Sequence, residues 1–231
     1  MSACLQVHAL VTPSHAALLN HWFLRTMPAD CVSVVHSRDA EPAQFARGHW
    51  HRVVGQKLEI VLDAIAALDP DALFVMSDVD VCFYGAIADD LRRRMRGLDV
   101  LFQNNRPSLP EAADNVCSGF MVIRATARSS DFFERARNVL RTADDAAVGD
   151  QRACIEVLRA FPDLIRWGFL PVTYWSPGDP RGRWEPGMSL APPEGLLLHH
   201  ANHTIGVANK LAQLQAVASL MEIREAQELL P

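Results

Sequence analysis

Two aspartates placed two positions apart, at the end of a short apolar run, are the clearest chemical signal in the chain. The stretch from Leu73 to Gly85 reads LFVMSDVDVCFYG, and its apolar run leads into Asp78 and Asp80. Because side chains alternate across a strand, residues i and i+2 are expected to point to the same face. Two such carboxylates repel each other unless a cation lies between them. The spacing therefore predicts a divalent metal that holds a phosphorylated ligand, at the carboxyl end of a buried strand.

An Asp-X-Asp triplet also occurs in solvated turns, so its surroundings decide its interpretation. The apolar lead-in and the aromatic exit Phe83-Tyr84-Gly85 argue against a simple turn. The same pattern describes the nucleophile strand of haloacid-dehalogenase-like phosphatases, where the first aspartate attacks phosphorus and the second is the acid/base. That fold usually opens with the motif and later has a Gly-Asp-X-X-X-Asp pair. Here a complete βαβ unit precedes the motif, and Gly149-Asp150-Gln151 lacks the second aspartate, so the phosphatase is the alternative.

Three other places in the chain carry side chains that suit such a site. Lys57 lies near the start of a predicted helix from Val53 to Leu68, and on its own it would be a solvated lysine. Asp150 precedes a short predicted helix and is either its N-cap or a group aimed at the site. His200 ends the last predicted strand and His203 follows it. Histidines in that position could complete a metal shell or donate to a phosphate.

The elements that must position these residues begin with a βαβ unit. Leu5 to Val11 is predicted as the first strand, and a helix with Ser14 as its N-cap and a broad apolar side follows. Cys31 to Ser37 is the second strand, rich in β-branched residues. This unit implies a parallel pair with a right-handed crossover. It has no GxGxxG fingerprint, so a dinucleotide cofactor is not expected.

Helices and strands continue to alternate toward the C-terminus. The glycine of Cys117-Ser118-Gly119 suggests close approach by a ligand, or a bend. The stretch from Trp167 to Pro193 is expected to be irregular, and its Trp175 and Trp184 either stack on a sugar or base or pack this region. The other predicted elements are helices at 86–96, 126–142 and 207–230, and strands at 99–103, 120–124 and 195–200.

Composition limits the class of protein. The 231 residues are 49% apolar and 21% charged, which is ordinary for one globular α/β domain. A formal charge of −5 gives no reason to expect a nucleic-acid partner. Five scattered cysteines without a Cys-X-X-Cys pair are typical of a reducing compartment. With no signal peptide and no apolar segment of membrane-spanning length, a cytoplasmic protein is expected.

Several of these pieces occur in an order that resembles a known family. The order is Lys57 on a helix, the apolar strand into Asp78-Val79-Asp80, SGFMVIR, Asp150-Gln151, and finally HHANHTIGVANK. It resembles the nucleotide-diphospho-sugar transferase family, glycosyltransferases with the GT-A fold that include plant rhamnogalacturonan xylosyltransferase-like enzymes. The resemblance implies a single domain over residues 1–231, with a Rossmann-like α/β fold and a mostly parallel central sheet flanked by helices. It places a C-terminal helix at about 207–230.

The resemblance further implies a nucleotide-sugar donor, usually a UDP-sugar, and a Mn²⁺ or Mg²⁺ ion. Carried over by position, Asp80 ligates the metal directly, while Asp78 contacts the ribose or reaches the metal, directly or through water. In the pattern His-X-Asn-X-X-X-Gly-X-X-X-Lys, His200 is the third metal ligand. His203 fits a related His-X-X-Gly pattern and is its competitor. The other residues expected to bind the donor are Thr12, Lys57, Asn202, Gly206 and Lys210.

Asp150 and Gln151 are implied to face the sugar or the acceptor, and they are the candidate catalytic residues. A bound metal would stabilise charge on the leaving diphosphate, and Lys210 and Lys57 would add fixed positive charge. Inversion needs a carboxylate base on the acceptor side, whereas the resemblance favours retention. Where the family often has Asn-Ser/Thr-Gly, this chain has Cys117-Ser118-Gly119, which leaves the identity of the sugar open.

A non-catalytic nucleotide-sugar-binding protein is a further alternative. The predicted C-terminal helix carries an apolar stripe that includes Leu211, Leu214 and Val217. This stripe is a candidate surface for a homodimer, although such stripes more often pack on their own domain. Slow hydrolysis or transfer of a donor sugar would distinguish an enzyme from a binding protein.

Overall fold

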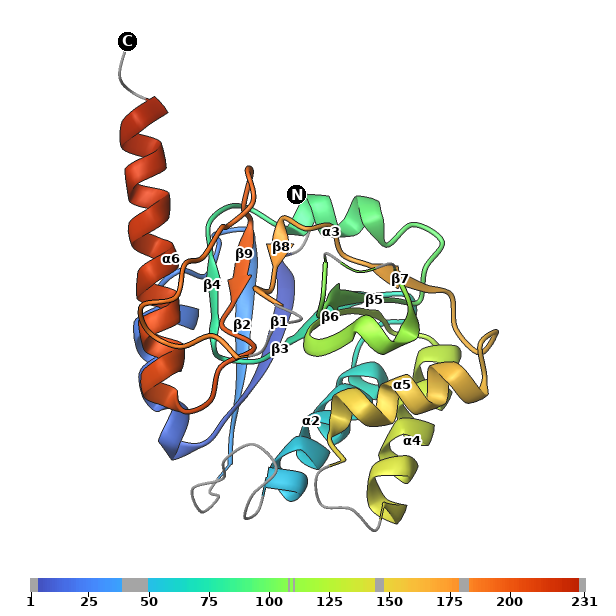
Figure 1. The fold of residues 1–231 in the computed structure, drawn as a ribbon. Helices are drawn as coiled ribbons and strands as arrows, with labels where there is room; N and C mark the ends of the chain where they lie inside the picture. Colours follow the sequence, from blue (N-terminus) through green and yellow to red (C-terminus); the bar gives the residue numbers. More distant parts are fainter. Residues whose placement is uncertain are drawn as a thin grey trace.

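The computed structural model describes residues 4–38, 50–107, 109, 111–143, 148–178 and 183–228. A six-stranded sheet lies at its centre, in the order β2-β1-β3-β6-β5-β7 (Figure 1). Strand β6 runs antiparallel to both of its neighbours, whereas the other three neighbouring pairs are parallel. The strands of this sheet are β1 (Leu5–Val11), β2 (Cys31–Ser37), β3 (Leu73–Ser77), β5 (Val100–Asn104), β6 (Val116–Arg124) and β7 (Trp167–Phe169).

Three helices cover one face of this sheet, namely α2 (Trp50–Ala67), α4 (Ala127–Thr142) and α5 (Asp150–Ala160) (Figure 1). Strand β3 shows how the sequence builds this face. Phe74 and Met76 are fully buried in a core with these helices, while Val75 between them is buried in a second core on the opposite face. A strand buried on both faces is why β3 reads as a continuous apolar run. The predicted α/β fold with a mostly parallel sheet flanked by helices is confirmed.

A second, smaller sheet lies against the opposite face, in the order β4-β9-β8. Its strands are β4 (Val81–Phe83), β9 (Leu198–His200) and β8 (Tyr174–Trp175), and the same side of the molecule carries α3 (Ala88–Arg94) and α6 (Val207–Glu228). The strand predicted at 195–200 is therefore shorter than expected and does not belong to the central sheet. Helix α6 extends beyond the body of the domain (Figure 1), and residues 229–230 of the predicted helix lie outside the described residues.

The helix predicted after Ser14 is wrong in type, although its apolar side is correct. The chain forms a 3₁₀ turn, η1 (Pro13–His15), a three-residue α1 (Ala16–Leu18), and a π-helical turn, η2 (Leu19–Phe23). Ser14 does not cap this segment, because its hydroxyl contacts Thr12 Oγ1 at 3.0 Å and His15 Nδ1 at 3.0 Å. Leu18 and Phe23 are fully buried, as their spacing predicts.

The stretch from Trp167 to Pro193 contains the short strands β7 and β8, and the rest of its described part is irregular. Trp175 is 8% exposed and Trp184 is 7% exposed. The indole nitrogen of Trp184 donates to the carbonyl of Met188 at 3.1 Å. Both tryptophans therefore pack this region, and neither presents a free ring face to a ligand.

Candidate active site

Asp78 and Asp80 lie in the link that joins the two sheets. The chain leaves β3 at Ser77, bends through residues 78–80 and enters β4 at Val81, so the two aspartates follow the strand and do not belong to it. Their backbones are fixed from both sides, since Asp78 N–H donates to Gly119 O and Ala201 N–H donates to Asp80 O, each at 2.8 Å. The predicted convergence of the carboxylates therefore depends on this bend and not on strand alternation.

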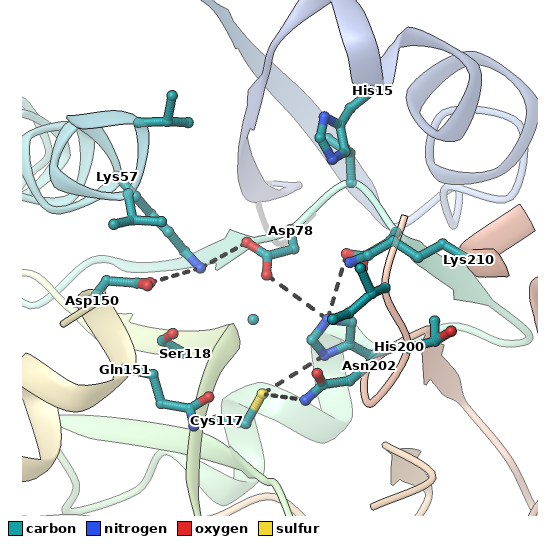
Figure 2. Close-up of a pocket in the computed structure, with 18 of the residues that line it drawn as sticks. His15, Lys57, Asp78, Cys117, Ser118, Asp150, Gln151, His200, Asn202 and Lys210 are labelled. Carbon is teal, nitrogen blue, oxygen red and sulfur yellow. Dashed lines mark hydrogen bonds and ion pairs between the residues drawn. The ribbon is translucent and has the colours of Figure 1, made fainter. Parts of the chain in front are cut away.

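His200 completes a group of three metal-ligand side chains. Strand β9 pairs with β4 so that His200 lies opposite Val81, next to the aspartates. Its Nε2 lies 3.4 Å from Asp80 Oδ1 and 3.8 Å from Asp78 Oδ2, and Figure 2 shows the contact between His200 and Asp78. Within the described part of the chain, this is the one group of three such side chains with ligand atoms close enough to share an ion. Two carboxylates and an imidazole suit Mn²⁺, with Mg²⁺ as a substitute.

Two lysines, the buried Lys57 and the partly buried Lys210, hold the outer oxygens of the aspartates. Lys57 donates to Asp78 Oδ1 at 2.7 Å and lies 3.1 Å from Asp150 Oδ2 (Figure 2). Lys210 contacts Asp80 Oδ2. Each aspartate is thus left with one oxygen, Oδ2 of Asp78 and Oδ1 of Asp80, facing His200 Nε2. The three atoms that remain are those that a cation would use. Lys57 is 4% exposed, so its interpretation as a solvated lysine is wrong.

The pKa values of these groups show how strongly the site favours positive charge near the aspartates. Burial alone would lower the pKa of Lys57, but Asp150 and Asp78 outweigh burial and raise it. The pKa of His200 is likewise lowered by burial but raised to about 10 overall, mainly by Asp80. Burial would raise the pKa of Asp80, yet Lys210 and His200 hold it well below its usual range. Asp80 is therefore charged and surrounded by cationic groups.

His203, the competing ligand, points elsewhere. Its Nε2 lies 3.0 Å from Asn105 Oδ1 and 3.1 Å from Asn105 O, and it is not part of the three-residue group. His203 has a left-handed backbone with φ of 55°, which turns the chain after β9 toward α6. These contacts favour His200 over His203 as the ligand.

Asp150 is aimed at the site and is not the N-cap of its helix. Gly149 occupies the N-cap position of α5, and Asp150 begins the helix with a side chain that reaches Lys57. Glycine is among the residues preferred at an N-cap, and the backbone of Gly149 is extended there. Gln151 follows on the same turn and also lines this cavity.

All ten predicted site residues line one cavity of about 600 Å³. Its wall is formed by the carboxyl ends of β1 and β3, the first turn of α5, β6 at Cys117 to Gly119, and the loop that leads into α6. Thr12 lies at the end of β1, where its hydroxyl is 3.1 Å from His15 Nδ1. Sequence reasoning missed several residues of this wall, and they are His15, Asn105, Arg152 and Arg183.

A comparison with known protein families decides the family. Residues 20–214 match the model described as nucleotide-diphospho-sugar transferase. The chain belongs to this family of glycosyltransferases. The matched segment contains both aspartates and His200, and it ends within α6 at the position of the buried Leu214. The family supersedes the phosphatase alternative.

Solved structures of glycosyltransferases have the same fold. The chain is similar to a glycosyltransferase involved in the glycosylation of the major capsid of PBCV-1, with a TM-score of 0.60, 12% identity, and coverage of 90% of this chain and 97% of that chain. WbbM, a bifunctional glycosyltransferase, gives 0.56 and 11%, with coverage of 87% and 46%. GlyE of Streptococcus pneumoniae TIGR4 gives 0.52 and 10%, with coverage of 75% and 47%. At these identities the likeness shows the fold alone, which is the GT-A fold.

No curated protein matches the chain in sequence. No helix among the described residues is long and apolar enough to cross a membrane. Family and fold thus define the reaction class, while the donor, the acceptor and the metal are matters for proposal.

Proposed function

We propose that the protein is a metal-dependent glycosyltransferase that moves a sugar from a UDP-sugar to an acceptor, with retention at the anomeric carbon. The observation that carries the metal is the convergence of Asp78 Oδ2, Asp80 Oδ1 and His200 Nε2, with the other oxygen of each aspartate held by a lysine. Family membership supports the nucleotide-sugar donor. Mn²⁺ is the proposed ion because imidazole joins the two carboxylates, and Mg²⁺ is its substitute.

When bound, the ion would act as a Lewis acid that stabilises charge on the diphosphate leaving group. The chain adds fixed positive charge at the same place. Lys210 lies on the first turn of α6. This helix begins directly after Gly206, whose φ of 85° lets the backbone turn sharply into it. Lys57 approaches from the other side, on α2. Preorganised charges aimed at the place where charge develops stabilise it without reorganisation during the reaction.

The remaining predicted residues have roles that follow from their place on the cavity wall. Thr12 lies at the end of β1 and is proposed to contact the nucleoside part of the donor. Asn202 and Gly206 line the same cavity as Lys210, whose backbone N–H donates to Gly206 O, and both are proposed to contact the diphosphate. Asp150 and Gln151, on the first turn of α5, are proposed to contact the sugar or the acceptor.

Transfer breaks the bond between the anomeric carbon and the diphosphate oxygen, which keeps the electron pair. The acceptor hydroxyl oxygen forms the new bond to the anomeric carbon, and its proton passes to the departing diphosphate oxygen. Outside the metal group, Asp150 is the single carboxylate on the described wall of the cavity, and Lys57 already engages its Oδ2 at 3.1 Å. Such a carboxylate is better placed to fix Lys57 and hydroxyl groups than to act as the free base that inversion requires. This arrangement supports retention.

Calorimetric titration of UDP into metal-stripped protein, with and without Mn²⁺, tests the proposal. We expect binding that depends on Mn²⁺ and is lost in Asp80→Asn, because this change removes the charge of a central ligand. Asp89→Asn is the matched control, since Asp89 lies on α3 with a side chain that is 86% exposed. Mn²⁺-dependent binding in Asp80→Asn equal to that of the wild type would overturn the site assignment.

A panel of UDP-sugars, each incubated with enzyme and Mn²⁺, then separates catalysis from binding alone. Slow hydrolysis of one donor, with retained configuration of the released sugar measured by NMR, is the expected result. Binding of UDP without hydrolysis of any donor, and without transfer to simple acceptors, would favour the non-catalytic alternative. Failure of UDP to bind under either condition would contradict the choice of nucleotide.

A further inference from the structure

Gln103 is a fully buried amide whose two ends are both engaged. It ends the apolar part of β5, its Nε2 donates to the carbonyl of Tyr174 at 3.1 Å, and its Oε1 lies 2.7 Å from His200 Nδ1. A carbonyl can only accept, so the amide nitrogen must face Tyr174 and the amide oxygen must face His200. Nδ1 of His200 therefore carries the proton of this hydrogen bond. The other ring nitrogen, Nε2, is the one that faces the two aspartates.

The strand pairing is interrupted where Gln103 lies. Strands β5 and β6 pair Phe102 with Met121, but the next pair is Gln103 with Cys117, so three residues of β6 fall between consecutive pairs. Irregularities of this kind change the direction of a side chain and often occur next to functional sites. Here the shift accompanies the contact of Gln103 with a histidine on β9, a strand of the other sheet.

Gly119 lies within this irregular stretch and leaves room for the histidine ring. A Cβ atom at this position would lie 2.0 Å from His200 Cε1, and 2.8 Å from each ring nitrogen. No side chain fits there unless the ring moves. The carbonyl of Gly119 also accepts from Asp78 N–H, so one residue contacts the backbone of one proposed ligand and the ring of another.

We propose that Gln103 and Gly119 are positioning residues for the metal, with Gln103 selecting the tautomer of His200 and Gly119 fixing the place of its ring. This inference rests on the metal site of the proposed function and goes beyond its ligand set. The hydrogen-bond partner of a metal-bound histidine orients the ring and sets the nitrogen that binds. Removing such a partner typically weakens metal affinity about 10- to 100-fold.

The test of Gln103 is Mn²⁺ affinity, measured from the free-ion signal in electron paramagnetic resonance without any donor. Gln103→Met keeps the shape and removes the acceptor, and we expect the affinity to fall about 10- to 100-fold. Gln103→Glu restores an acceptor for Nδ1–H, and we expect it to regain most of the affinity. Gln213→Met is the control, because Gln213 is equally buried and its Nε2 also donates to a backbone carbonyl, that of Asn202.

Gly119→Ala tests the space beside the ring. We expect a similar loss of Mn²⁺ affinity with retained secondary structure by circular dichroism. Gly168→Ala is the matched control, since Gly168 is also a strand glycine but a Cβ there would make an ordinary contact of 3.4 Å with Leu101. Equal losses in the two alanine variants, or in the two methionine variants, would overturn the inference.

Two further outcomes separate this inference from the proposed function. If the wild type binds Mn²⁺ and His200→Ala does not, but Gln103→Met binds it like the wild type, the metal site stands and the positioning role is refuted. If the wild type does not bind Mn²⁺, both fail. Long-range ¹H–¹⁵N spectra of the wild type with diamagnetic Mg²⁺ need no variant. They should show the His200 proton on Nδ1, and a proton on Nε2 in that spectrum would overturn the inference.

Discussion

Replacing Lys57 by methionine should lower the free energy of unfolding by more than the loss of a solvated helical lysine would. Lys57 is 4% exposed and is shared by two carboxylates, with Asp78 Oδ1 at 2.7 Å and Asp150 Oδ2 at 3.1 Å. The two partners differ in their access to water, because the side chain of Asp78 is 42% exposed and that of Asp150 is 8% exposed. Removal of the lysine therefore leaves one carboxylate partly solvated and the other buried without its partner.

The expected cost follows from the buried partner. Breaking a buried ion pair by removing one member costs about 3–5 kcal/mol, because an uncompensated charge stays in the protein interior. We expect this range for Lys57→Met. If Asp150 causes the cost, the double variant Lys57→Met/Asp150→Asn should be more stable than Lys57→Met alone, by about 1–3 kcal/mol. Arg152→Met is the control at an exposed pair, where Arg152 and Glu156 are 54% and 39% exposed and the loss should stay below about 1 kcal/mol.

Urea unfolding followed by circular dichroism gives these free energies, with a chelator present so that no divalent ion compensates for the missing lysine. Lys57→Met, Asp150→Asn, the double variant and the wild type form a thermodynamic cycle that isolates the Lys57–Asp150 coupling. A loss below about 1 kcal/mol in Lys57→Met, or a double variant that loses the sum of the two single losses, would refute the reasoning. Unchanged denaturant slopes are needed for the comparison to hold.

Three other predictions follow from single contacts. His200→Ala should abolish Mn²⁺ binding in the electron paramagnetic resonance assay. His203→Ala, which loses contacts to Asn105, should change the Mn²⁺ affinity less than about tenfold. The reverse order would make His203 the ligand. Burial, and then the neighbouring His36, lower the pKa of His8 to about 4, from about 6.5 in the unfolded state. Between these two pH values the unfolded state binds the extra proton. The free energy of unfolding should therefore fall as the pH drops through this window, by up to about 1.4 kcal/mol per pH unit. His8→Phe should flatten this pH dependence in urea titrations, and an unchanged slope would refute the assignment. Thr126→Ala should cost about 0.5–2 kcal/mol in thermal unfolding because its hydroxyl accepts from Ser129 N–H at the start of α4, and no loss would mean that the cap is not needed.

The sequence was most informative where a local pattern sets a local structure. The alternation and apolar runs of β1, β2 and β3 are read directly, and so is α4 after Thr126, because period and cap lie within one segment. The segment after Pro13 was predicted with the wrong helix type. Its apolar residues have a spacing that a π-helical turn satisfies nearly as well as an α-helix, so the pattern does not distinguish the two.

The same distinction between local patterns and distant contacts separates the residues of the candidate site that could be predicted from those that could not. Asp78 and Asp80 could be found because they are neighbours in sequence, and His200 because it ends a strand in a recognisable motif. Gln103 could not, since it meets His200 across 97 positions and between two sheets. Lys57 and Asp150 are 93 positions apart by their numbers, and their contact requires α2 and α5 to lie side by side on the sheet. Such pairs depend on topology, which no single segment encodes.

The candidate site lies at the junction of the two sheets, so its geometry depends on how the sheets pack against each other. Asp78 is tied to β6 of the main sheet through Gly119, whereas Asp80 is tied to Ala201, the residue directly after β9 of the second sheet. His200 belongs to the second sheet but is held by Gln103 of the main one. An ion bound by all three side chains would therefore join both sheets, and its affinity would report on their packing, because a site that forms only on folding couples binding to stability. Any substitution that shifts one sheet against the other should lower the metal affinity even where the protein stays folded.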